Sequence, residues 1–499
     1  MSGGPTRDKV ARGAILLTVT RLLSRSFDLV TLIVLTRVLL PADFGLVAIA
    51  LSVMQVTEAV LELSTGQAIL QFRTVTRRHL DTAFTIALLR GAAIALILCA
   101  IALPLALFYD EPRLAALTCA MAIAPAIRGL RSPRLYLLIR HLRFGPEAAS
   151  EFVGKVVSLA AAVSLALATG SYWAIAAGTI FNPVGSTLCS YLLTRYRPRL
   201  SLADWPQFQH FVGWSMASQT VSAFNWQADR FILAKFVSQS TLGIFSTARE
   251  FAGLSYKVMF DTMQRPVLSA LASANFDTAR LRRAYIMLVA ALLSVGLPIA
   301  VGQALVAPEL VRLLLGEKWL MAIPAVQAIS LTLLPGIFVN LTISLFYATG
   351  QPHLVFRRNL QDFLFRIPAT IILVWQWGMT GAVIALVAAD LFVATLCLFS
   401  AGRIAGVGVV EQLVSPWRGI VSTVAMAATV VALRGAVPPT PGIIGSLEFL
   451  ALAVSAGGVV YAASHLAMWH LAGRPDGIEE VVLRLLRSKL SSRTRPSLA

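Results

Sequence analysis

The sequence predicts an all-α integral membrane protein with roughly fourteen transmembrane helices. Hydrophobic residues make up 57% of the chain and charged residues only 13%, whereas soluble domains carry about a quarter charged residues. Apolar stretches long enough for a bilayer, which takes about 20 residues, follow one another with short polar breaks. The Lys and Arg residues behind the net charge of +18 are spread over those breaks, which argues against a nucleic-acid partner.

Hydropathy divides the chain into spans joined by short connections. The predicted spans are residues 13–38, 44–66, 82–107, 113–132, 149–168, 172–194, 210–236, 241–268, 284–306, 322–348, 356–375, 379–401, 416–435 and 444–470. The even-numbered connections hold most of the basic residues, and the positive-inside rule places them in the cytoplasm. An even number of crossings then puts both termini there. The first span lacks a small-residue cleavage site, so we expect it to remain in the mature multi-pass membrane protein.

The sequence has no pattern typical of a metal site or a resident cofactor. Its cysteines lie in apolar runs, far apart and without the paired spacing of zinc or redox motifs: Cys99, Cys119, Cys189 and Cys397. We therefore expect them to be small core residues, and we expect no metal and no cofactor.

A short internal repeat predicts two related halves. When Leu35–Ala50 is aligned without gaps on Leu233–Ala248, at an offset of 198 residues (233 − 35), Gly45 matches Gly243 and Arg37 matches Lys235. The offset spans six predicted helices, which implies an N-terminal lobe over 1–200 and a C-terminal lobe over 201–405, related by an axis along the membrane normal. Two further helices follow in 406–472. The last segment, 473–499, favours an amphipathic helix on the inner leaflet, and a solvated cytoplasmic tail is the alternative.

Several local motifs recur along the chain in a fixed order. They are Leu40-Pro41-Ala42-Asp43-Phe44-Gly45-Leu46, Leu80-Asp81-Thr82-Ala83-Phe84, Phe108-Tyr109-Asp110-Glu111-Pro112, Arg140-His141-Leu142-Arg143-Phe144, Tyr172-Trp173-Ala174, Asp229-Arg230 with Leu242-Gly243-Ile244-Phe245, and Gly316-Glu317-Lys318-Trp319. Together they resemble the Wzx/WzxC-type polysaccharide flippases of the multidrug/oligosaccharidyl-lipid/polysaccharide (MOP) superfamily, over nearly the full length.

This resemblance implies a V-shaped bundle of two six-helix lobes, with helices 1, 2, 7 and 8 lining a central cavity. It implies a polyprenyl-pyrophosphate-linked oligosaccharide as the substrate, passed from the cytoplasmic to the periplasmic leaflet by alternating access. Membrane lipids are implied as further partners, together with polysaccharide polymerase and co-polymerase proteins.

Charged side chains inside the predicted spans point to the same function. Such a side chain costs at least about 2.5 kcal/mol at bilayer depth, so it usually faces a wet interior. The cations predicted to bind the pyrophosphate headgroup are Arg21, Arg25, Arg90, Arg249 and Lys257. Arginine suits this role because its planar guanidinium binds phosphate oxygens in pairs and stays charged.

The acidic residues in the same spans have two open interpretations. They are Asp28, Glu58, Glu62, Asp229, Asp261 and Asp390. They either keep the cations oriented or titrate and couple transport to a proton or sodium gradient. A purely structural ion network between helices is the alternative for Arg21, Arg25, Asp28 and Glu58. For Glu62 and Asp261, which lie near the cytoplasmic ends, the alternative is that the side chains extend to the membrane surface.

Other functions fit the sequence less well. A membrane glycosyltransferase, polymerase or ligase would need an acid/base constellation on a sizeable outward loop, and the predicted outward connections are short, so we expect no catalytic residues. An ion-coupled exporter of cationic drugs would need an anionic cavity. A flippase for lipid II, the peptidoglycan precursor, remains open, because its substrate carries the same pyrophosphate. A channel or scaffold is a remote alternative.

Overall fold

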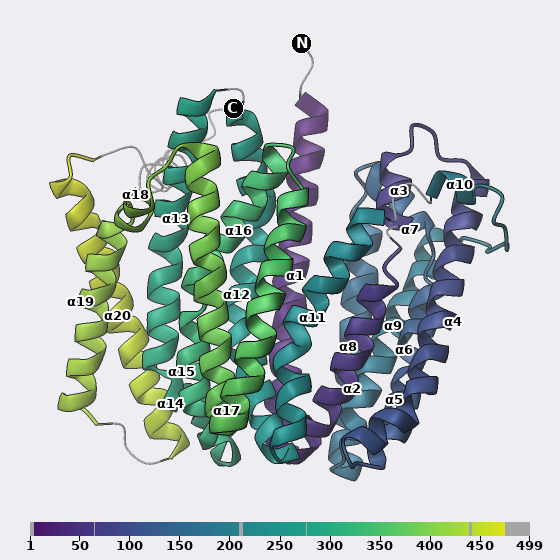
Figure 1. Ribbon diagram of the computed structural model, residues 1–499, viewed down its shortest axis with the longest axis horizontal. Coiled ribbons are helices and arrows are strands. Elements are labelled where there is room, and N and C mark those ends of the chain that lie inside the picture. Colours follow the sequence, from purple (N-terminus) through teal and green to yellow (C-terminus); the bar gives the residue numbers. More distant parts are fainter. Residues whose placement is uncertain (1–3, 64, 209–212, 276, 439–441, 475–499) are drawn as a thin grey trace, which may run out of the picture. The chain divides into compact units, whose positions relative to one another are not determined.

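The computed structural model describes residues 4–63, 65–208, 213–275, 277–438 and 442–474, and every regular element in these ranges is a helix (Figure 1). The helices are α1 Gly4–Val38, α2 Pro41–Val60, α3 Thr65–Gln71, α4 Arg77–Phe108, α5 Arg113–Met121, α6 Ile123–Gly129, α7 Arg134–Arg140, α8 Gly145–Thr169, α9 Trp173–Thr194, α10 Trp205–Phe208, α11 Gly213–Phe236, α12 Gln239–Ala274, α13 Thr278–Leu305, α14 Ala307–Leu310, α15 Ile323–Leu331, α16 Leu333–Ala348, α17 His353–Ala405, α18 Val409–Val414, α19 Trp417–Ala436 and α20 Ile443–Leu471. A π-helical turn at Val311–Leu315 and a 3₁₀ turn at Glu317–Ala322 lie between α14 and α15.

Within the described ranges, 8 helices are long and apolar enough to cross a membrane, or up to 9 if a bent pair formed by Arg113–Gly129 and Arg134–Arg140 is one span. The 53-residue helix α17 is one of the eight. It is interrupted at Gly378, whose φ of 55° is not helical, and this glycine lies in the turn predicted between two spans. Four other predicted spans fall on α1, α9, α11 and α12, which are outside that set of eight.

The chain divides into two compact units, which we describe separately. Unit 1 comprises residues 1–251, 315–322 and 359–386, and unit 2 comprises 252–314, 323–358 and 387–499. The predicted lobe boundaries near residues 200 and 405 remain predictions.

Each unit has its own packed interior. In unit 1, α8 and α9 form a hairpin in which small residues allow close approach: a Cβ on Gly154 would lie 2.9 Å from the carbonyl oxygen of Asn182. In unit 2, the core is built around α13, where Tyr285 and Val289 are fully buried beside Ile337 of α16. The Tyr285 hydroxyl donates to Oε1 of Gln412 over 3.1 Å, so the buried phenol is satisfied.

The aligned hairpins α1–α2 and α11–α12 have matching helix ends. Helix α1 ends at Val38 and α11 at Phe236, and α2 begins at Pro41 and α12 at Gln239, so both pairs of ends differ by the predicted 198 residues (236 − 38 and 239 − 41). At the start of α2, proline stands at the first helical position and the Leu40 amide donates to Oδ2 of Asp43 over 2.9 Å. The two hairpin tips are therefore the same structural unit used twice.

Two connecting segments contact these hairpin tips. Each forms a contact between the two repeats within unit 1. In the 3₁₀ turn, the Trp319 indole donates to the Thr36 carbonyl of α1 over 3.0 Å and packs edge-on against Phe44, with ring centroids 5.0 Å apart. After α4, the Tyr109 hydroxyl donates to the Phe231 carbonyl of α11 over 3.0 Å. Both aromatic residues belong to the motifs singled out above. We call this arrangement, made of segments 35–46, 108–113, 233–245 and 316–319, the clasp.

Candidate functional site

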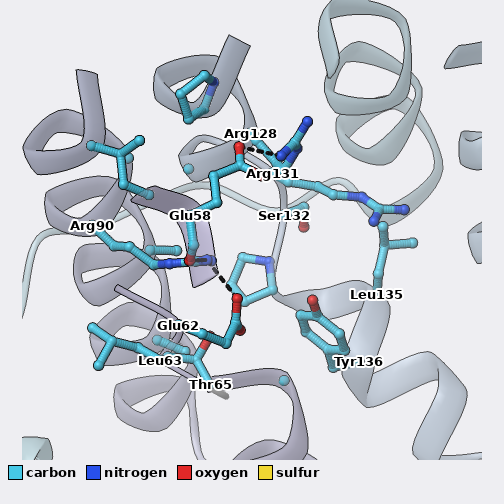
Figure 2. Close-up of a pocket in the computed structure, with 18 of the residues that line it drawn as sticks. Glu58, Glu62, Leu63, Thr65, Arg90, Arg128, Arg131, Ser132, Leu135 and Tyr136 are labelled. Atoms are coloured by element: carbon cyan, nitrogen blue, oxygen red, sulfur yellow. Dashed lines mark hydrogen bonds and ion pairs between the residues drawn. The ribbon is translucent and has the colours of Figure 1, made fainter. Parts of the chain in front are cut away.

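A charged cavity of about 390 Å³ lies inside unit 1, lined by residues from α2, α3, α4, α6 and α7 and by the first turn of α8 (Figure 2). Its charged residues are Glu58, Glu62, Arg90, Arg128, Arg131 and Glu147. Small and apolar side chains, among them Ala87 and Ile94 of α4, complete the lining together with the Tyr136 ring.

The cavity opens where the second predicted span is interrupted. The sequence predicts a continuous span over 44–66, but α2 ends at Val60 and α3 begins at Thr65. Arg90 of α4 caps the break: its Nε donates to the Leu61 carbonyl over 2.7 Å and its Nη2 to the Glu58 carbonyl over 2.8 Å. A cation at the carboxyl end of a helix satisfies carbonyls that have no partner within the helix.

A glycine lets the cavity wall close over the break. A Cβ on Gly66 of α3 would lie only 2.5 Å from Cε1 of Tyr136. Any larger residue at this position would push the aromatic ring away. The Tyr136 ring therefore packs directly on the backbone of α3 and forms one side of the cavity.

Every charged group in the cavity has a partner of opposite sign. Arg128 pairs with Glu58, and Nη2 of Arg90 lies 2.5 Å from Oε2 of Glu62, as Figure 2 shows. The third pair joins Nη2 of Arg131 to Oε2 of Glu147 over 3.2 Å. With three guanidinium groups and three carboxylates, the lining has no formal net charge.

The equivalent positions in the second repeat carry apolar and aromatic residues. At the offset of 198, Tyr256 stands for Glu58 and Phe260 for Glu62. Their rings lie 4.3 Å apart by centroid. Helix α12 runs unbroken through this region, and Met259, the equivalent of Leu61, belongs to the buried core of unit 2. The same scaffold thus holds ion pairs in one repeat and an apolar core in the other.

A second cluster of charges lies deeper in unit 1, on α11, α12 and α17. The Asp229 side chain is 0% exposed, and its Oδ2 lies 2.7 Å from Nη1 of Arg249 and 3.9 Å from Nη1 of Arg366. Arg366 also binds Asp362 one turn earlier, from its Nε to Oδ1 over 3.0 Å. Thr370 donates to Oδ1 of Asp229 over 3.4 Å. These are buried ion pairs with added hydrogen bonds, the arrangement in which removal of one partner is most damaging.

A third cluster joins α1 to α8. The Asp28 carboxylate lies 3.5 Å from Nη1 of Arg25 and also pairs with Nζ of Lys155. Two cations therefore share one carboxylate in this cluster, and each of the three side chains is about one-quarter to one-third exposed.

The structure brings most of the predicted site residues together in small groups. Arg90 lies with Glu58 and Glu62, Arg25 with Asp28, and Arg249 with Asp229. The remaining predicted residues are distributed as follows: Lys257 and Asp390 belong to unit 2, and the side chains of Arg21 and Asp261 lie outside the described residues.

Sequence reasoning missed three residues of the charged cavity. Arg128 and Arg131, at the end of the predicted span 113–132, count among the basic residues that mark the cytoplasmic side by the positive-inside rule, and Glu147 was not singled out. The signal that could have found them was the need of Glu58 and Glu62, two carboxylates in a predicted span, for cationic partners from neighbouring helices.

Comparison with solved structures identifies the fold. The chain is similar to a structure of the lipid II flippase MurJ in an inward closed conformation, with 14% identity, coverage of 92% of this chain and 100% of that chain, and a TM-score of 0.74. It is also similar to an inward-facing multidrug resistance transporter of the MATE family in the MOP superfamily, with 16% identity, coverage of 78% and 98%, and a TM-score of 0.59. The fold is that of these transporters.

Sequence comparison defines the family. Residues 34–324, more than half of the chain, match the model of the polysaccharide biosynthesis protein family, and the chain belongs to this family. The resemblance seen in the sequence motifs is thereby confirmed.

Curated relatives carry matching descriptions. The teichuronic acid biosynthesis protein TuaB of Bacillus subtilis is 22% identical over 60% of this chain and 63% of its own length. The succinoglycan biosynthesis transport protein ExoT of Rhizobium meliloti is 24% identical over 61% and 62%. The lipopolysaccharide biosynthesis protein WzxC of Escherichia coli is 23% identical over 73% and 75%. The match thus spans less than two thirds of the first two relatives.

Proposed function

We propose that this protein is a flippase that moves a polyprenyl-pyrophosphate-linked oligosaccharide from the cytoplasmic to the periplasmic leaflet for surface polysaccharide biosynthesis. Family membership and the transporter fold support this proposal. The observation that carries it is the gathering of costly charges inside a membrane protein into interior clusters. The side chains of Asp229, Arg366 and Arg249 are 0%, 7% and 11% exposed, respectively, as expected of groups that serve a polar path and avoid lipid.

The proposed topology has fourteen spans with both termini in the cytoplasm of a bacterium, in its inner membrane. Helices α1, α9, α11 and α12 have 35, 22, 24 and 36 residues. At about 1.5 Å per residue, each is long enough for a hydrocarbon core of about 30 Å. Together with α5–α6 as one span and α17 as two, they complete the set of fourteen expected from hydropathy.

The Arg25–Asp28–Lys155 cluster is the best candidate in unit 1 for binding the pyrophosphate. It brings a guanidinium and an ammonium group to one place between α1 and α8, and both groups are donors that bind phosphate oxygens. The other predicted headgroup ligands, Arg21, Arg90, Arg249 and Lys257, would act at other stages of passage. The acids would keep these cations oriented, or would bind and release ions and so couple transport to a proton or sodium gradient; they are Asp28, Glu58, Glu62, Asp229, Asp261 and Asp390.

Transport by alternating access would expose the bound headgroup to one leaflet at a time. The clasp is the part of unit 1 that would have to loosen and re-form in such a cycle, because it lies at the end opposite to the predicted cytoplasmic connections. Polysaccharide polymerase and co-polymerase proteins would receive the product, and membrane lipids would surround the chain.

Two alternatives within the same fold need separate tests. The MurJ structure is described as a lipid II flippase and the MATE structures as multidrug transporters, so both functions are compatible with the architecture. Deletion of the gene distinguishes them: loss of surface polysaccharide with normal growth supports the proposal, lysis supports lipid II transport, and drug sensitivity alone supports an exporter. A role as an enzyme finds no support among these transporter-like relatives.

The direct test is reconstitution. Purified protein in lipid vesicles should move a lipid-pyrophosphate glycan between leaflets, measured as its accessibility to an impermeant reagent, with and without proton and sodium gradients. Empty vesicles provide the control.

A further inference from the structure

The charged cavity of unit 1 is an unusual way to fill the interior of a helix bundle. Replacing buried ion pairs by packed apolar residues is often neutral or stabilising. This chain contains such a replacement for the two carboxylates of α2, because Tyr256 and Phe260 occupy the positions in unit 2 that are equivalent to Glu58 and Glu62. The ion pairs of Glu58 and Glu62 are therefore not required for the repeated scaffold, and their presence in one repeat points to a ligand.

The charge balance of the cavity indicates what that ligand is. Three carboxylates face the same space as three guanidinium groups, so a pyrophosphate would meet repulsion from Glu58 and Glu62 as well as attraction from Arg128. A sugar hydroxyl has no such conflict. It can donate to a carboxylate and accept from a guanidinium at once, and the ion pairs keep their charges.

One buried polar atom supports this assignment. Nε of Arg131 has no hydrogen-bond partner within the described ranges, whereas Nη2 of the same side chain lies 3.2 Å from Oε2 of Glu147. A buried donor without a partner needs an explanation. A hydroxyl group entering the cavity would supply an acceptor for it.

The apolar lining suits the remainder of a sugar ring. Ala87 and Ile94 of α4 and the Tyr136 ring line the cavity beside the charged groups. A pyranose has polar edges and apolar C–H faces, so it matches a pocket with an apolar wall and a few directed polar groups. The volume of about 390 Å³ lies near the lower end of the usual range for ligand pockets.

We propose that this cavity binds an uncharged sugar residue of the lipid-linked oligosaccharide. This inference rests on the proposed function and extends it by separating the glycan from the pyrophosphate, which is left to the Arg25 cluster. Glu58 and Glu62 accept hydrogen bonds from sugar hydroxyls, and Arg128 and Arg131 donate to them. The cavity lies near the Arg-rich connection after α6, which is predicted to be cytoplasmic, so it is loaded from the side where the substrate is made.

The test measures binding of a neutral glycan to the full-length protein in detergent micelles. The probe is the repeat-unit oligosaccharide released from the host's own lipid-linked precursor by mild acid, which removes the pyrophosphate. The wild type should bind it, and E58Q and E62Q should each weaken binding tenfold or more, as expected for loss of a hydrogen bond to a charged group. The matched control is E411Q, which breaks the exposed pair of Arg282 and Glu411 at 2.8 Å in unit 2 and should leave the affinity unchanged.

A charge-swapped variant separates binding from a structural role. E58R combined with R128E restores an ion pair, so it should restore the melting temperature lost in either single variant but not the affinity for the glycan. Binding recovered by the swap, or unaffected by E58Q, would overturn the proposal. Displacement of the glycan by inorganic pyrophosphate would identify an anion site instead, and displacement by phosphatidylethanolamine would identify a lipid site. Absence of binding to the wild type would also refute it.

Failure of this inference is distinguishable from failure of the proposed function. If vesicles with the wild type and vesicles with E58Q transport the lipid-pyrophosphate glycan equally well, the flippase function is supported and the sugar site is refuted. If the wild type binds the free glycan but does not transport the lipid-linked form, the sugar site is supported and the flippase function is refuted.

Discussion

Gly45 of α2 and Gly243 of α12 lie against each other in a reciprocal contact. A Cβ built on Gly45 would lie 3.1 Å from the Gly243 amide nitrogen, and one built on Gly243 would lie 2.9 Å from the Gly45 amide nitrogen. Each would also meet a carbonyl oxygen of the other helix, of Gln239 at 1.9 Å and of Pro41 at 1.8 Å. A contact in which two equivalent residues exchange equivalent neighbours is the mark of a local two-fold axis.

This relationship predicts that the crossing does not tolerate a side chain. Gly243→Ala should destabilise the protein by about 1–3 kcal/mol, because backbone atoms on the facing helix cannot move aside easily. Gly253→Ala on the same helix is the control, since a Cβ there meets nothing within 4 Å, and it should be neutral or slightly stabilising. The measurement is the thermal unfolding midpoint in detergent. Equal midpoints for the two variants would show that the contact does not fix the crossing.

The clasp should be insensitive to pH over the physiological range. Hydrogen bonds from Arg113 lower the pKa of Glu111 from 4.5 to about 2, and Gln239 of the α12 tip contributes a further bond. Because the folded-state pKa is depressed, the stabilisation is complete above about pH 4.5 and is lost as the pH falls toward 2. The difference in unfolding midpoint between the wild type and E111Q should stay constant from pH 8 to 5 and shrink below 4.5. A difference that already changes between pH 8 and 6 would contradict this account.

Arg25 should be essential for function but not for folding. We expect Arg25→Ala to abolish surface-polymer production while the protein inserts and is expressed at normal levels, because Lys155 still pairs with Asp28. Arg280→Ala, which removes an arginine with 78% of its side chain exposed, should complement a deletion strain fully. Polymer is measured on whole cells and protein by immunoblot of membranes. Full complementation by Arg25→Ala would argue for a structural or dispensable arginine.

Asp229 should be essential for stability. Asp229→Ala leaves the guanidinium groups of Arg249 and Arg366 buried without their shared carboxylate, a change that costs about 3–5 kcal/mol. We expect greatly reduced folded protein in membranes and a lower unfolding midpoint. The double variant Asp229→Ala/Arg249→Ala, which also removes one of the unpaired guanidinium groups, should recover part of the lost unfolding midpoint. An unchanged midpoint in the single variant would show that the pair is not coupled to folding.

The sequence predicted much of the architecture because hydropathy and charge bias are set by the bilayer. The order of the spans, the turn at Gly378 and the alignment of the α1–α2 and α11–α12 hairpins all follow from patterns within short windows. The glycines of the repeat were informative because only Gly fits where two backbones approach so closely, and this requirement is visible as Gly45 and Gly243 at equivalent positions.

The pairing of the charges was not predictable in the same way. The cost of burial identified Glu58 and Arg90 as residues that needed an explanation, but their partners come from elsewhere in the chain. The break after Val60 is capped by Arg90, 29 residues beyond Leu61 (90 − 61), which binds a carbonyl at the end of α2. The sequence Ser64-Thr65-Gly66 is a local signal for a break, but it does not identify this partner. Likewise, the predicted residues Glu58, Glu62 and Arg90 have one carboxylate in excess, and the cavity is neutral because Arg128 of α6 packs against Glu58.

The central claim is that this chain carries a lipid-linked glycan across the bilayer, and reconstitution tests it most directly. Proteoliposomes loaded with a fluorescent polyprenyl-pyrophosphate oligosaccharide should expose the inner-leaflet pool to an impermeant reagent within the assay, and those containing Arg25→Ala should expose only the outer pool. Equal protection of the inner pool in wild-type and protein-free vesicles, with and without ion gradients, would contradict the account.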